Sequence, residues 1–315
     1  MRIHESSSMA SLEPCGVLLI NKPVGLTSHD IVYRVRRLFN TRRVGHTGTL
    51  DPMATGVLVV LVGRAAKASD FVAHDTKGYV ATLRLGLMTD TEDTTGRILS
   101  VRPFDTLPDE ATVRSACANF VGDIMQIPPM YSALKVNGKK LCNLARKGEI
   151  IERESRPVTI HSLDVNPATL PSDYKLTVRC SGGTYIRTLC ADIGASLGCG
   201  GVMASLERTE TGGFSLDACY TTDELQNMTY EDRLSCLLPV ETLFSDWEAV
   251  HLPAFYYRLC HNGCEIYQSR IGTCFPVGTR LRLCDEEGRF FATGEVLDCP
   301  EVNATAIKAT RLFVL

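Results

Sequence analysis

Residues 45–56 read Gly-His-Thr-Gly-Thr-Leu-Asp-Pro-Met-Ala-Thr-Gly, and this glycine-punctuated loop is the most informative stretch of the chain. It sets a lone carboxylate, Asp51, beside an imidazole and threonine hydroxyls. Pro52 disfavours the helical region for the residue before it, so we expect Asp51 to be held extended. Gly45, Gly48 and Gly56 permit backbone turns that other residues resist. Such a loop brings its backbone close to a substrate, and Asp51 is predicted to be a reacting group.

Four further stretches surround this loop, at residues 16–23, 77–79, 127–135 and 183–189. Together with residues 45–56, and in this order, they closely resemble the motifs of the tRNA pseudouridine synthase B family (TruB). In that family the aspartate of the loop is the catalytic residue. Agreement of several ordered motifs over most of the chain is not expected by chance.

The resemblance implies an α+β protein with the pseudouridine synthase fold, in which a cleft crosses a central mixed β-sheet. We expect a disordered leader at residues 1–13, because this stretch is polar and serine-rich. A catalytic domain is expected at residues 14–250. From residue 251 onward, short β-like runs alternate with turn signals, and this part resembles the family's small PUA-like RNA-binding domain at residues 251–315.

Local patterns predict the elements of the catalytic domain. Residues 16–21 are typical of a buried strand, and residues 79–86 and 174–180 alternate as half-buried strands do. Thr27 or Ser28 can cap a helix whose apolar residues recur at helical spacing up to Phe39. Further helices are expected at 109–121, 141–147 and 184–197. Strands interleaved irregularly with helices favour an α+β sheet domain over a regular doubly wound one.

Charge is distributed unevenly along the chain, although the net value is only −3. Residues 14–67 hold eight basic and two acidic side chains, a net charge of +6. Residues 215–250 hold one basic and eight acidic side chains, a net charge of −7. The first segment is therefore a candidate phosphate-binding face, with its arginines between residues 34 and 43 next to the Asp51 loop. The second is not expected to contact nucleic acid.

Composition favours a soluble cytoplasmic protein without a metal site. The longest apolar run, residues 57–62, is far shorter than the roughly 20 residues that span a bilayer, and no hydrophobic signal region begins the chain. The thirteen cysteines are scattered and include no CxxC pair. We therefore expect buried free thiols rather than a disulfide scaffold or a structural zinc site.

The chemistry implied by the resemblance needs no cofactor. Pseudouridine forms when the glycosidic bond breaks, the uracil turns and carbon 5 joins the ribose, with no net oxidation or hydrolysis. Asp51 matches the family's essential aspartate, and the sequence leaves open whether it attacks the ribose or the base; taken alone, it could be a turn or cap residue. Arg187 matches the arginine that pairs with this carboxylate and favours its ionised form. Tyr79 matches the family's tyrosine that stacks on the target base and is a candidate for proton transfer, so it is counted with the catalytic residues. Taken alone, it could be an ordinary aromatic residue at a strand start.

Other matched positions are expected to bind the substrate. Tyr185 and Leu206 would shield the uracil from water, and Leu206 alone would be read as a core residue. His46 matches a histidine that helps to hold the RNA loop open while the uridine is flipped out, a step that opposes a few kcal/mol of stacking. Lys22 and Lys67 are expected to give structural support or phosphate contacts.

Three features depart from these patterns or tempt another interpretation. Gly182 and Glu207 stand where the family commonly has a lysine and an arginine, which is expected to weaken RNA contacts without touching the chemistry. Residues 90–93 form an acidic cluster that lacks the calcium-loop spacing, so a polar loop is favoured over a metal site.

The resemblance predicts an isomerase that converts uridine 55 in the T loop of tRNA to pseudouridine. We expect a monomer that binds the T-arm. Guide RNA is not expected, because the related dyskerin branch, which works within a guide-RNA particle, usually has longer basic tails than this chain. Two alternatives stay open: a tRNA-folding chaperone without chemistry, and a hydrolase that uses Asp51 as a general base. Steep salt dependence of tRNA binding is expected for the isomerase and for the chaperone, but not for a small-molecule hydrolase.

Overall fold

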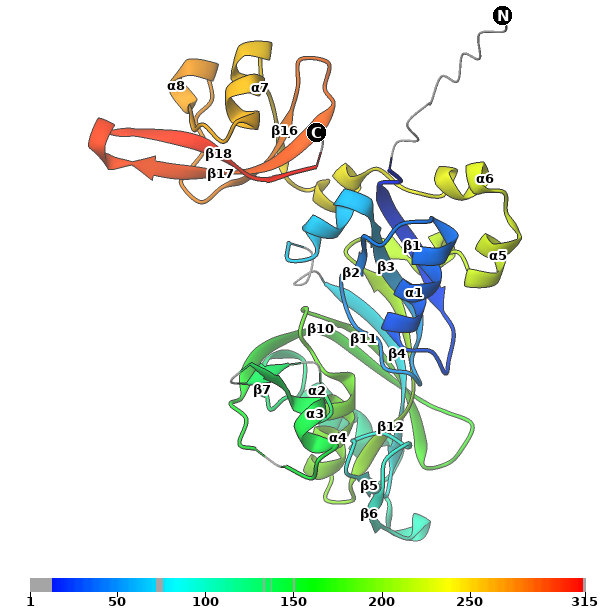
Figure 1. Ribbon diagram of the computed structural model, residues 1–315. Helices are drawn as coiled ribbons and strands as arrows, with labels where there is room; N and C mark the ends of the chain where they lie inside the picture. Colours follow the sequence, from blue (N-terminus) through cyan, green and yellow to red (C-terminus); the bar gives the residue numbers. More distant parts are fainter. Residues whose placement is uncertain (1–12, 72–75, 133, 137, 150, 314–315) are drawn as a thin grey trace, which may run out of the picture.

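The computed structural model describes residues 13–71, 76–132, 134–136, 138–149 and 151–313, arranged as two sheet domains (Figure 1). The predicted leader lies outside the described residues except for Glu13, whose carboxylate pairs with Arg43 at 2.9 Å. Within the described residues no helix combines the length and apolar character needed to cross a membrane.

A mixed sheet forms the centre of the larger domain. Its strands run in the order β1-β3-β12-β4-β11-β10-β7, with β2 paired to β3 and β13 paired to β12. All the pairings are antiparallel except that of β3 with β12. The bounds are β1 Gly16–Lys22, β2 Val44–His46, β3 Thr55–Val62, β4 Lys77–Leu85, β7 Gly122–Gln126, β10 Arg156–Pro167, β11 Asp173–Cys180, β12 Gly201–Thr211 and β13 Phe214–Ser215.

Strand β3 is buried on both faces, which explains its continuous apolar run. Leu58, Val60 and Val62 face the core beneath the helices. Val57 and Val59 face a second core that continues toward the C-terminal domain. The sheet is therefore covered on both sides at the point where the chain leaves the Asp51 loop.

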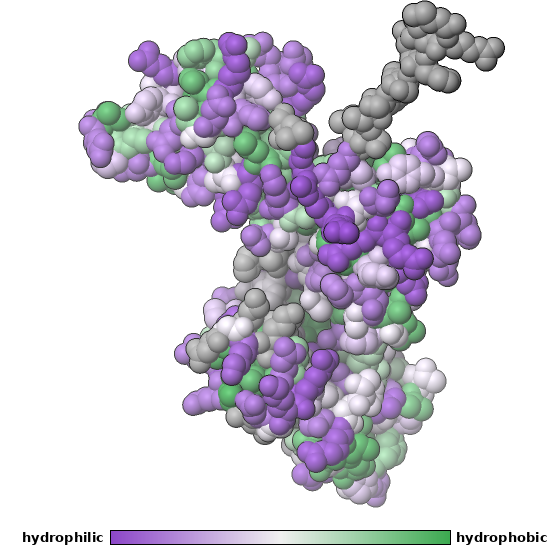
Figure 2. Space-filling model, viewed as in Figure 1, coloured by the Kyte–Doolittle hydropathy of each residue, from purple (hydrophilic) through white to green (hydrophobic). Residues whose placement is uncertain are grey.

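Helix α1 (Ser28–Leu38) covers one face of this sheet. Thr27 is its N-cap and shares a capping box with Asp30, in which each side chain accepts a bond from the other's backbone N–H. Ile31, Val32 and Val35 are buried, as the helical spacing predicted. Figure 2 shows hydrophilic side chains over the outward face of α1 and an apolar patch at the tip formed by β5 (Leu87–Thr89) and β6 (Ile98–Val101).

The acidic segment folds into α5 (Thr222–Asn227) and α6 (Tyr230–Ser235), which lie near α1 (Figure 1). Arg233 Nη1 donates to the Leu38 carbonyl at the end of α1 over 2.6 Å. Arg34 Nη1 donates to Thr222 Oγ1 over 3.1 Å. Part of the arginine-rich face predicted to contact RNA thus binds the protein itself, since Arg43 also pairs with Glu13.

The remaining helices confirm the predicted positions to within a few residues. They are α2 (Glu110–Ala118), α3 (Leu141–Ala145) and α4 (Ile186–Ser196). Short elements complete this part: β8 Lys135–Val136, β9 Lys139–Lys140, and the 3₁₀ turns η1 Gly63–Ala68, η2 Phe104–Thr106, η3 Leu216–Ala218 and η4 Val240–Phe244.

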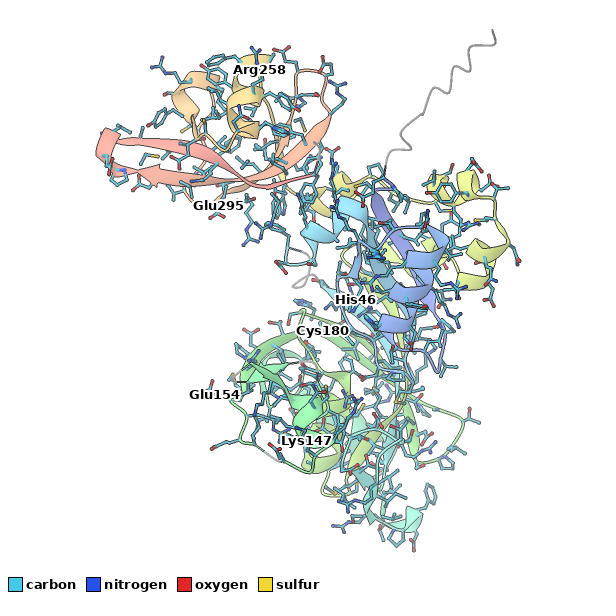
Figure 3. The ribbon with its side chains drawn as sticks, in the orientation of Figure 1. His46, Lys147, Glu154, Cys180, Arg258 and Glu295 are labelled. Atoms are coloured by element: carbon cyan, nitrogen blue, oxygen red, sulfur yellow. The ribbon has the colours of Figure 1, made fainter. Side chains whose placement is uncertain are left out.

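A five-stranded sheet forms the C-terminal domain, in the order β14-β16-β17-β18-β15. It begins at Glu248, three residues before the predicted boundary at 251. Figure 3 labels Arg258 on α7 and Glu295 on β17, on opposite sides of this domain. The bounds are β14 Glu248–His251, α7 Ala254–His261, β15 Ile266–Tyr267, α8 Gln268–Ile271, β16 Arg280–Cys284, β17 Phe290–Cys299, η5 Pro300–Val302 and β18 Ala304–Leu312.

An aromatic cluster joins the two domains. Phe244, from the end of the larger domain, has its ring centre 4.9 Å from that of Trp247 and 5.8 Å from those of Phe290 and Phe313. Lys67 adds a polar contact, because its Nζ donates to the Leu312 carbonyl over 3.1 Å. The C-terminal domain is thus packed against η1 and the end of the larger domain.

All thirteen cysteines are free thiols. The expectation of burial holds for part of them only: those buried are Cys117, Cys180, Cys190, Cys199, Cys260 and Cys284. Burial raises the pKa of the Cys117 thiol to about 11. A thiol of that kind stays protonated at neutral pH and is a poor nucleophile.

Candidate active site

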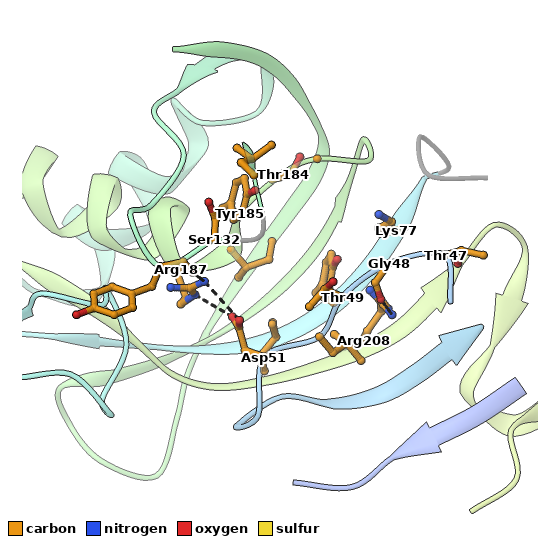
Figure 4. Close-up of a pocket in the computed structure, with 17 residues that line it drawn as sticks. Thr47, Gly48, Thr49, Asp51, Lys77, Ser132, Thr184, Tyr185, Arg187 and Arg208 are labelled. Atoms are coloured by element: carbon orange, nitrogen blue, oxygen red, sulfur yellow. Dashed lines mark hydrogen bonds and ion pairs between the residues drawn. The ribbon is translucent and has the colours of Figure 1, made fainter. Parts of the chain in front are cut away.

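A cavity of about 350 Å³ opens where the Asp51 loop faces the start of α4 (Figure 4). Its walls come from the stretches that the sequence analysis brought together. They are formed by Thr47, Gly48, Thr49, Leu50, Asp51, Lys77, Tyr79, Tyr131, Ser132, Leu134, Gly183, Thr184, Tyr185, Ile186, Arg187, Leu206 and Arg208. Asp51 is the one carboxylate among these described lining residues, and Lys77, Arg187 and Arg208 are the cations.

Asp51 begins a tight turn that is fixed from two directions. The Ala54 amide donates to the Asp51 carbonyl over 3.0 Å, so Pro52 occupies the second position of the turn, which its fixed φ favours. Just upstream, the buried Ser28 hydroxyl donates to the Leu50 carbonyl over 3.2 Å and accepts from the Leu50 amide over 2.8 Å. The start of α1 therefore anchors the residue before Asp51.

One of the three glycines in this loop adopts the left-handed conformation that the sequence suggested. Gly56 has φ +99°, and a Cβ there would collide with the Arg208 backbone. Gly45 and Gly48 have no such φ. Gly56 pairs with Arg208 in the parallel bridge between β3 and β12, so its missing side chain lets the two strands meet.

Arg187 forms a forked ion pair with Asp51. Its Nε lies 2.9 Å from Asp51 Oδ2, and its Nη2 donates to Oδ1 over 3.4 Å. The Arg187 side chain is only 6% exposed, whereas that of Asp51 is 33% exposed toward the cavity. The arginine holds the carboxylate in one orientation and leaves it open to a substrate.

Two backbone carbonyls hold the arginine in turn. Arg187 Nη1 donates to the Thr91 carbonyl over 3.0 Å, and Nη2 donates to the Tyr131 carbonyl over 2.8 Å. The Thr91 loop is itself fixed by Asp93, whose Oδ1 accepts bonds from the Thr91 and Thr95 hydroxyls at 2.8 and 2.6 Å. The acidic cluster at residues 90–93 thus includes a hydrogen-bonded turn that supports Arg187.

Arg187 also breaks a local rule of helix formation. It lies in the first turn of α4, which holds no acidic residue. A cation is disfavoured there by the positive end of the helix dipole. The Asp51 carboxylate offsets this repulsion through its ion pair with Arg187.

Tyr79 lies on β4 opposite Arg208 on β12. Burial raises the pKa of Tyr79, and the adjacent Arg208 guanidinium only partly opposes this effect. The phenol is therefore neutral at physiological pH and can donate a hydrogen bond. Tyr79 lines the cavity, and its role in stacking on a base stays a prediction.

Sequence reasoning missed Arg208. This side chain is 2% exposed, and it donates from Nε to the Val57 carbonyl over 2.7 Å and from Nη2 to the Gly48 carbonyl over 3.2 Å. A signal was present, because residues two apart on a strand share a face and Leu206 was already assigned to the pocket. Lys77, Tyr131 and Ser132 are likewise lining residues that lay within the quoted motifs without being singled out.

Tyr185 and Leu206 both line the cavity, and their shielding of a base from water stays a prediction. Leu206 is 8% exposed, and burial raises the pKa of Tyr185. The departures at Gly182 and Glu207 are next to lining residues, but neither lines the cavity.

Lys22 lies beneath the Asp51 loop rather than in the cavity. Its side chain is fully buried, and its Nζ donates to the carbonyls of Pro23, Leu26 and Pro52 at 3.0, 2.7 and 3.5 Å. Burial lowers the pKa of Lys22 to about 8, and the nearby Arg208 acts in the same direction. These contacts fit the structural role among the two that were predicted.

His46 and Lys67 stand apart from the cavity walls. His46 lies on β2 near the waist of the larger domain (Figure 3), and its buried Nδ1 has no hydrogen-bond partner among the described residues. Burial, aided by Arg208, lowers the pKa of His46, so the imidazole is neutral at pH 7. Lys67 is exposed and contacts Leu312 in the C-terminal domain.

The described residues contain no group of three or more histidine, cysteine, aspartate or glutamate residues that could hold a metal ion. What the cavity offers is one oriented carboxylate, a neutral phenol and a surrounding excess of buried positive charge. Such a site suits a polyanionic substrate that presents a planar group to be held between side chains.

Comparison with known proteins gives a consistent result. Residues 36–186 match the "TruB family pseudouridylate synthase (N terminal domain)", and residues 187–245 match the "tRNA pseudouridylate synthase B C-terminal domain". A protein named tRNA pseudouridine synthase B from Burkholderia mallei (strain NCTC 10247) is 48% identical over 276 residues, 87% of this chain and 90% of its own length. One of the same name from Clostridium novyi (strain NT) is 38% identical over 279 residues, 89% of this chain and 94% of its own.

Solved structures share the fold. The "Crystal Structure of a Cbf5-Nop10-Gar1 Complex" matches with a TM-score of 0.71 at 23% identity, over 95% of this chain and 85% of that one. The "Crystal structure of the archaeal box H/ACA sRNP Nop10-Cbf5 complex" matches with a TM-score of 0.69 at 21% identity, over 96% and 87%. The predicted α+β architecture, with a central mixed sheet and a β-rich C-terminal domain, is therefore confirmed.

Proposed function

This chain belongs to the TruB family of tRNA pseudouridine synthases, and we propose that it converts uridine 55 in the T loop of tRNA to pseudouridine with Asp51 as its essential carboxylate. The observation that carries the proposal is the forked pair of Asp51 and Arg187 in a cavity walled by Tyr79. No cofactor is required, because bond breaking and bond making both occur on the same nucleoside.

In this scheme the Asp51 carboxylate engages the reacting nucleoside as the glycosidic bond breaks. Arg187 keeps the carboxylate oriented and balances its charge where it faces the cavity. The freed uracil turns between Tyr79, Tyr185 and Leu206, which prevent its escape, and rejoins the ribose through carbon 5. Asp51 is also the carboxylate within reach to accept the proton that carbon 5 then loses.

The uridine must leave the stacked T loop to reach this cavity. Extruding a base costs a few kcal/mol of stacking free energy, which contacts with the protein have to offset. His46 is proposed to brace the opened loop from β2, outside the pocket, as a neutral imidazole. Lys77 and Arg208 at the cavity, and the net charge of +6 over residues 14–67, supply the attraction for phosphates.

The C-terminal domain at residues 251–315 is proposed to be a PUA-like module that extends the tRNA-binding surface. Its contact with Lys67 supports this view, because that lysine would then fix the module beside the catalytic domain. We further propose a monomer that acts in the cytoplasm and selects the T-arm directly, without guide RNA. The structural neighbours are described as complexes with Nop10, which makes the guide-free reaction the point to test.

The test is pseudouridine mapping at single-nucleotide resolution on unmodified tRNA incubated with the purified protein alone. Asp51→Ala serves as the control. Modification of uridine 55 by the intact protein, and none by the variant, is the expected result. If both proteins bind tRNA and neither modifies it, the guide-free reaction is refuted, and a chaperone role or a partner-dependent reaction replaces it.

A further inference from the structure

The wall of the cavity opposite the Asp51 loop depends on one buried amide. Gln126, the last residue of β7, is 2% exposed and faces the start of α4. Its Nε2 donates to the Tyr185 carbonyl over 3.0 Å, and its Oε1 accepts from the Tyr185 amide over 2.8 Å. A side-chain amide can make this two-point contact with the N–H and C=O of one residue because it carries a donor and an acceptor side by side.

The contact fixes the point at which α4 begins. Tyr185 is the N-cap of α4, and its own side chain caps nothing. Without Gln126 its amide would be an unsatisfied donor at a largely buried helix start, which is unfavourable. Arg187 follows two residues later in the first turn, so a shift of Tyr185 moves the guanidinium that holds Asp51.

The same segment reaches Arg187 by a second path. After Gln126 the chain runs through Pro128 and Pro129, whose fixed φ angles stiffen it. It then delivers the Tyr131 carbonyl that accepts from Arg187 Nη2 over 2.8 Å. Residues 126–132 and the start of α4 are thus joined at both ends, by Gln126 to Tyr185 and by Tyr131 to Arg187.

We propose that Gln126 is a positioning residue for pseudouridine formation, which acts through the Tyr185 backbone to place Tyr185 and Arg187 for the chemical step. This inference rests on the proposed function. Gln126 contacts neither the nucleoside nor Asp51, so its replacement is expected to affect the rate of the chemical step and not the affinity for tRNA. A misplacement of about 1 Å in an active site lowers rates by up to about 100-fold.

The C-terminal domain offers a matched control. Gln268 is 3% exposed, and it holds the Phe275 backbone in the same way, with 3.0 Å from its Nε2 to the carbonyl and 2.7 Å from the amide to its Oε1. Gln268→Leu removes this pair of bonds far from the cavity, and with it the bonds to the Thr305 and Thr273 hydroxyls at 2.7 and 3.4 Å. Its general loss of stability should therefore be at least as large as that of Gln126→Leu.

The experiment measures single-turnover rates with enzyme in saturating excess over tRNA, and tRNA affinity by filter binding, for wild type, Gln126→Leu and Gln268→Leu. We expect Gln126→Leu to lower the saturating rate by about 10- to 100-fold with affinity unchanged within a factor of about three. Gln268→Leu should retain the wild-type rate. Equal rates for the two variants, or a loss confined to affinity, would overturn the inference.

A third variant, Gln126→Glu, gives a signature that a merely structural role would lack. An ionised glutamate still accepts from the Tyr185 amide but cannot donate to its carbonyl, and protonation restores the donor. Its rate relative to wild type should therefore rise as the pH falls from about 8 to about 6, since burial raises a carboxyl pKa. The ratio for Gln126→Leu should stay flat, and a flat ratio for both variants would contradict the proposed contact.

Hydrogen exchange separates this inference from the function on which it rests. The Tyr185 amide should exchange faster in Gln126→Leu than in wild type, whatever the activity on tRNA. Unchanged exchange in the peptide that contains Tyr185 refutes the positioning role. Failure of the wild-type protein to modify tRNA refutes the proposed function instead.

Discussion

Replacing Arg187 by lysine tests whether the fork, rather than the positive charge, serves the reaction. The guanidinium makes two contacts with Asp51, at 2.9 and 3.4 Å, and two with the Thr91 and Tyr131 carbonyls, at 3.0 and 2.8 Å. A lysine ammonium is a point charge and cannot serve the carboxylate and both carbonyls from one position. We therefore expect Arg187→Lys to lose two of these four contacts.

The size of the expected rate loss follows from the free energy of hydrogen bonds made by a charged group. A hydrogen bond to a charged group contributes about 1.5–3 kcal/mol, so two lost contacts amount to at least about 3 kcal/mol. If this loss falls on the transition state, the single-turnover rate drops by roughly 150-fold or more. The assay is pseudouridine formation in tRNA under saturating enzyme at pH 7.5, with melting curves to verify that the variant is folded.

The control is Arg84→Lys. Arg84 makes an equally forked pair with Asp173, at 2.8 Å for both bonds, but it lies toward the far end of β4 and does not line the cavity. This variant should keep the wild-type rate. If Arg187→Lys is no slower than Arg84→Lys, the oriented pair has no part in catalysis and the reasoning about Asp51 fails with it.

Three further results are expected. Burial lowers the pKa of Lys22 from 10.5 to about 8, so the folded protein releases this proton at a lower pH than the unfolded chain does. The free energy of unfolding, measured by urea denaturation, should therefore rise between these pH values by up to about 3 kcal/mol relative to Lys22→Met. Parallel pH curves for the two proteins would contradict the burial of a charged amine. Gly56→Ala should lower stability by more than about 2 kcal/mol, and by more than Gly25→Ala, since Gly25 has a similar φ of +88° but open space around it; equal melting temperatures would show that strand contact at Gly56 is unimportant. Binding of tRNA should weaken linearly on a plot of log affinity against log salt, and a slope near zero in filter binding would exclude phosphate contacts.

Local pattern was sufficient for the elements but not for the ion pair at the centre of the site. The helix at Ser28–Leu38 and the strands around Tyr79 and Tyr174 follow from periodicity and capping, which act over a few residues. Asp51 and Arg187 were brought together only by the family resemblance, since they are 136 positions apart. No local signal predicts that distance to close.

Other parts of the site depend on tertiary contacts that the sequence does not reveal. Arg208 shares a strand face with Leu206, which was a local signal, but its bonds to the Val57 and Gly48 carbonyls become visible only when β12 lies beside β3 and β4. Several arginines near α1 suggested a free RNA-binding face, but Arg34 binds Thr222 in a helix nearly two hundred residues later. Burial of charge depends on which segments meet, so composition alone cannot assign it.

The aromatic cluster between the domains gives the chain a built-in optical reporter. Trp247 is the only tryptophan in the sequence, and it sits at the joint, with Phe244 on one side and the Arg280 guanidinium 5.8 Å from its ring centre. Indole emission responds to the polarity around the ring, so separation of the two sheets would shift it without any added label. Whether the domains stay together as tRNA binds can therefore be followed in the unaltered protein, in real time, from a single fluorophore.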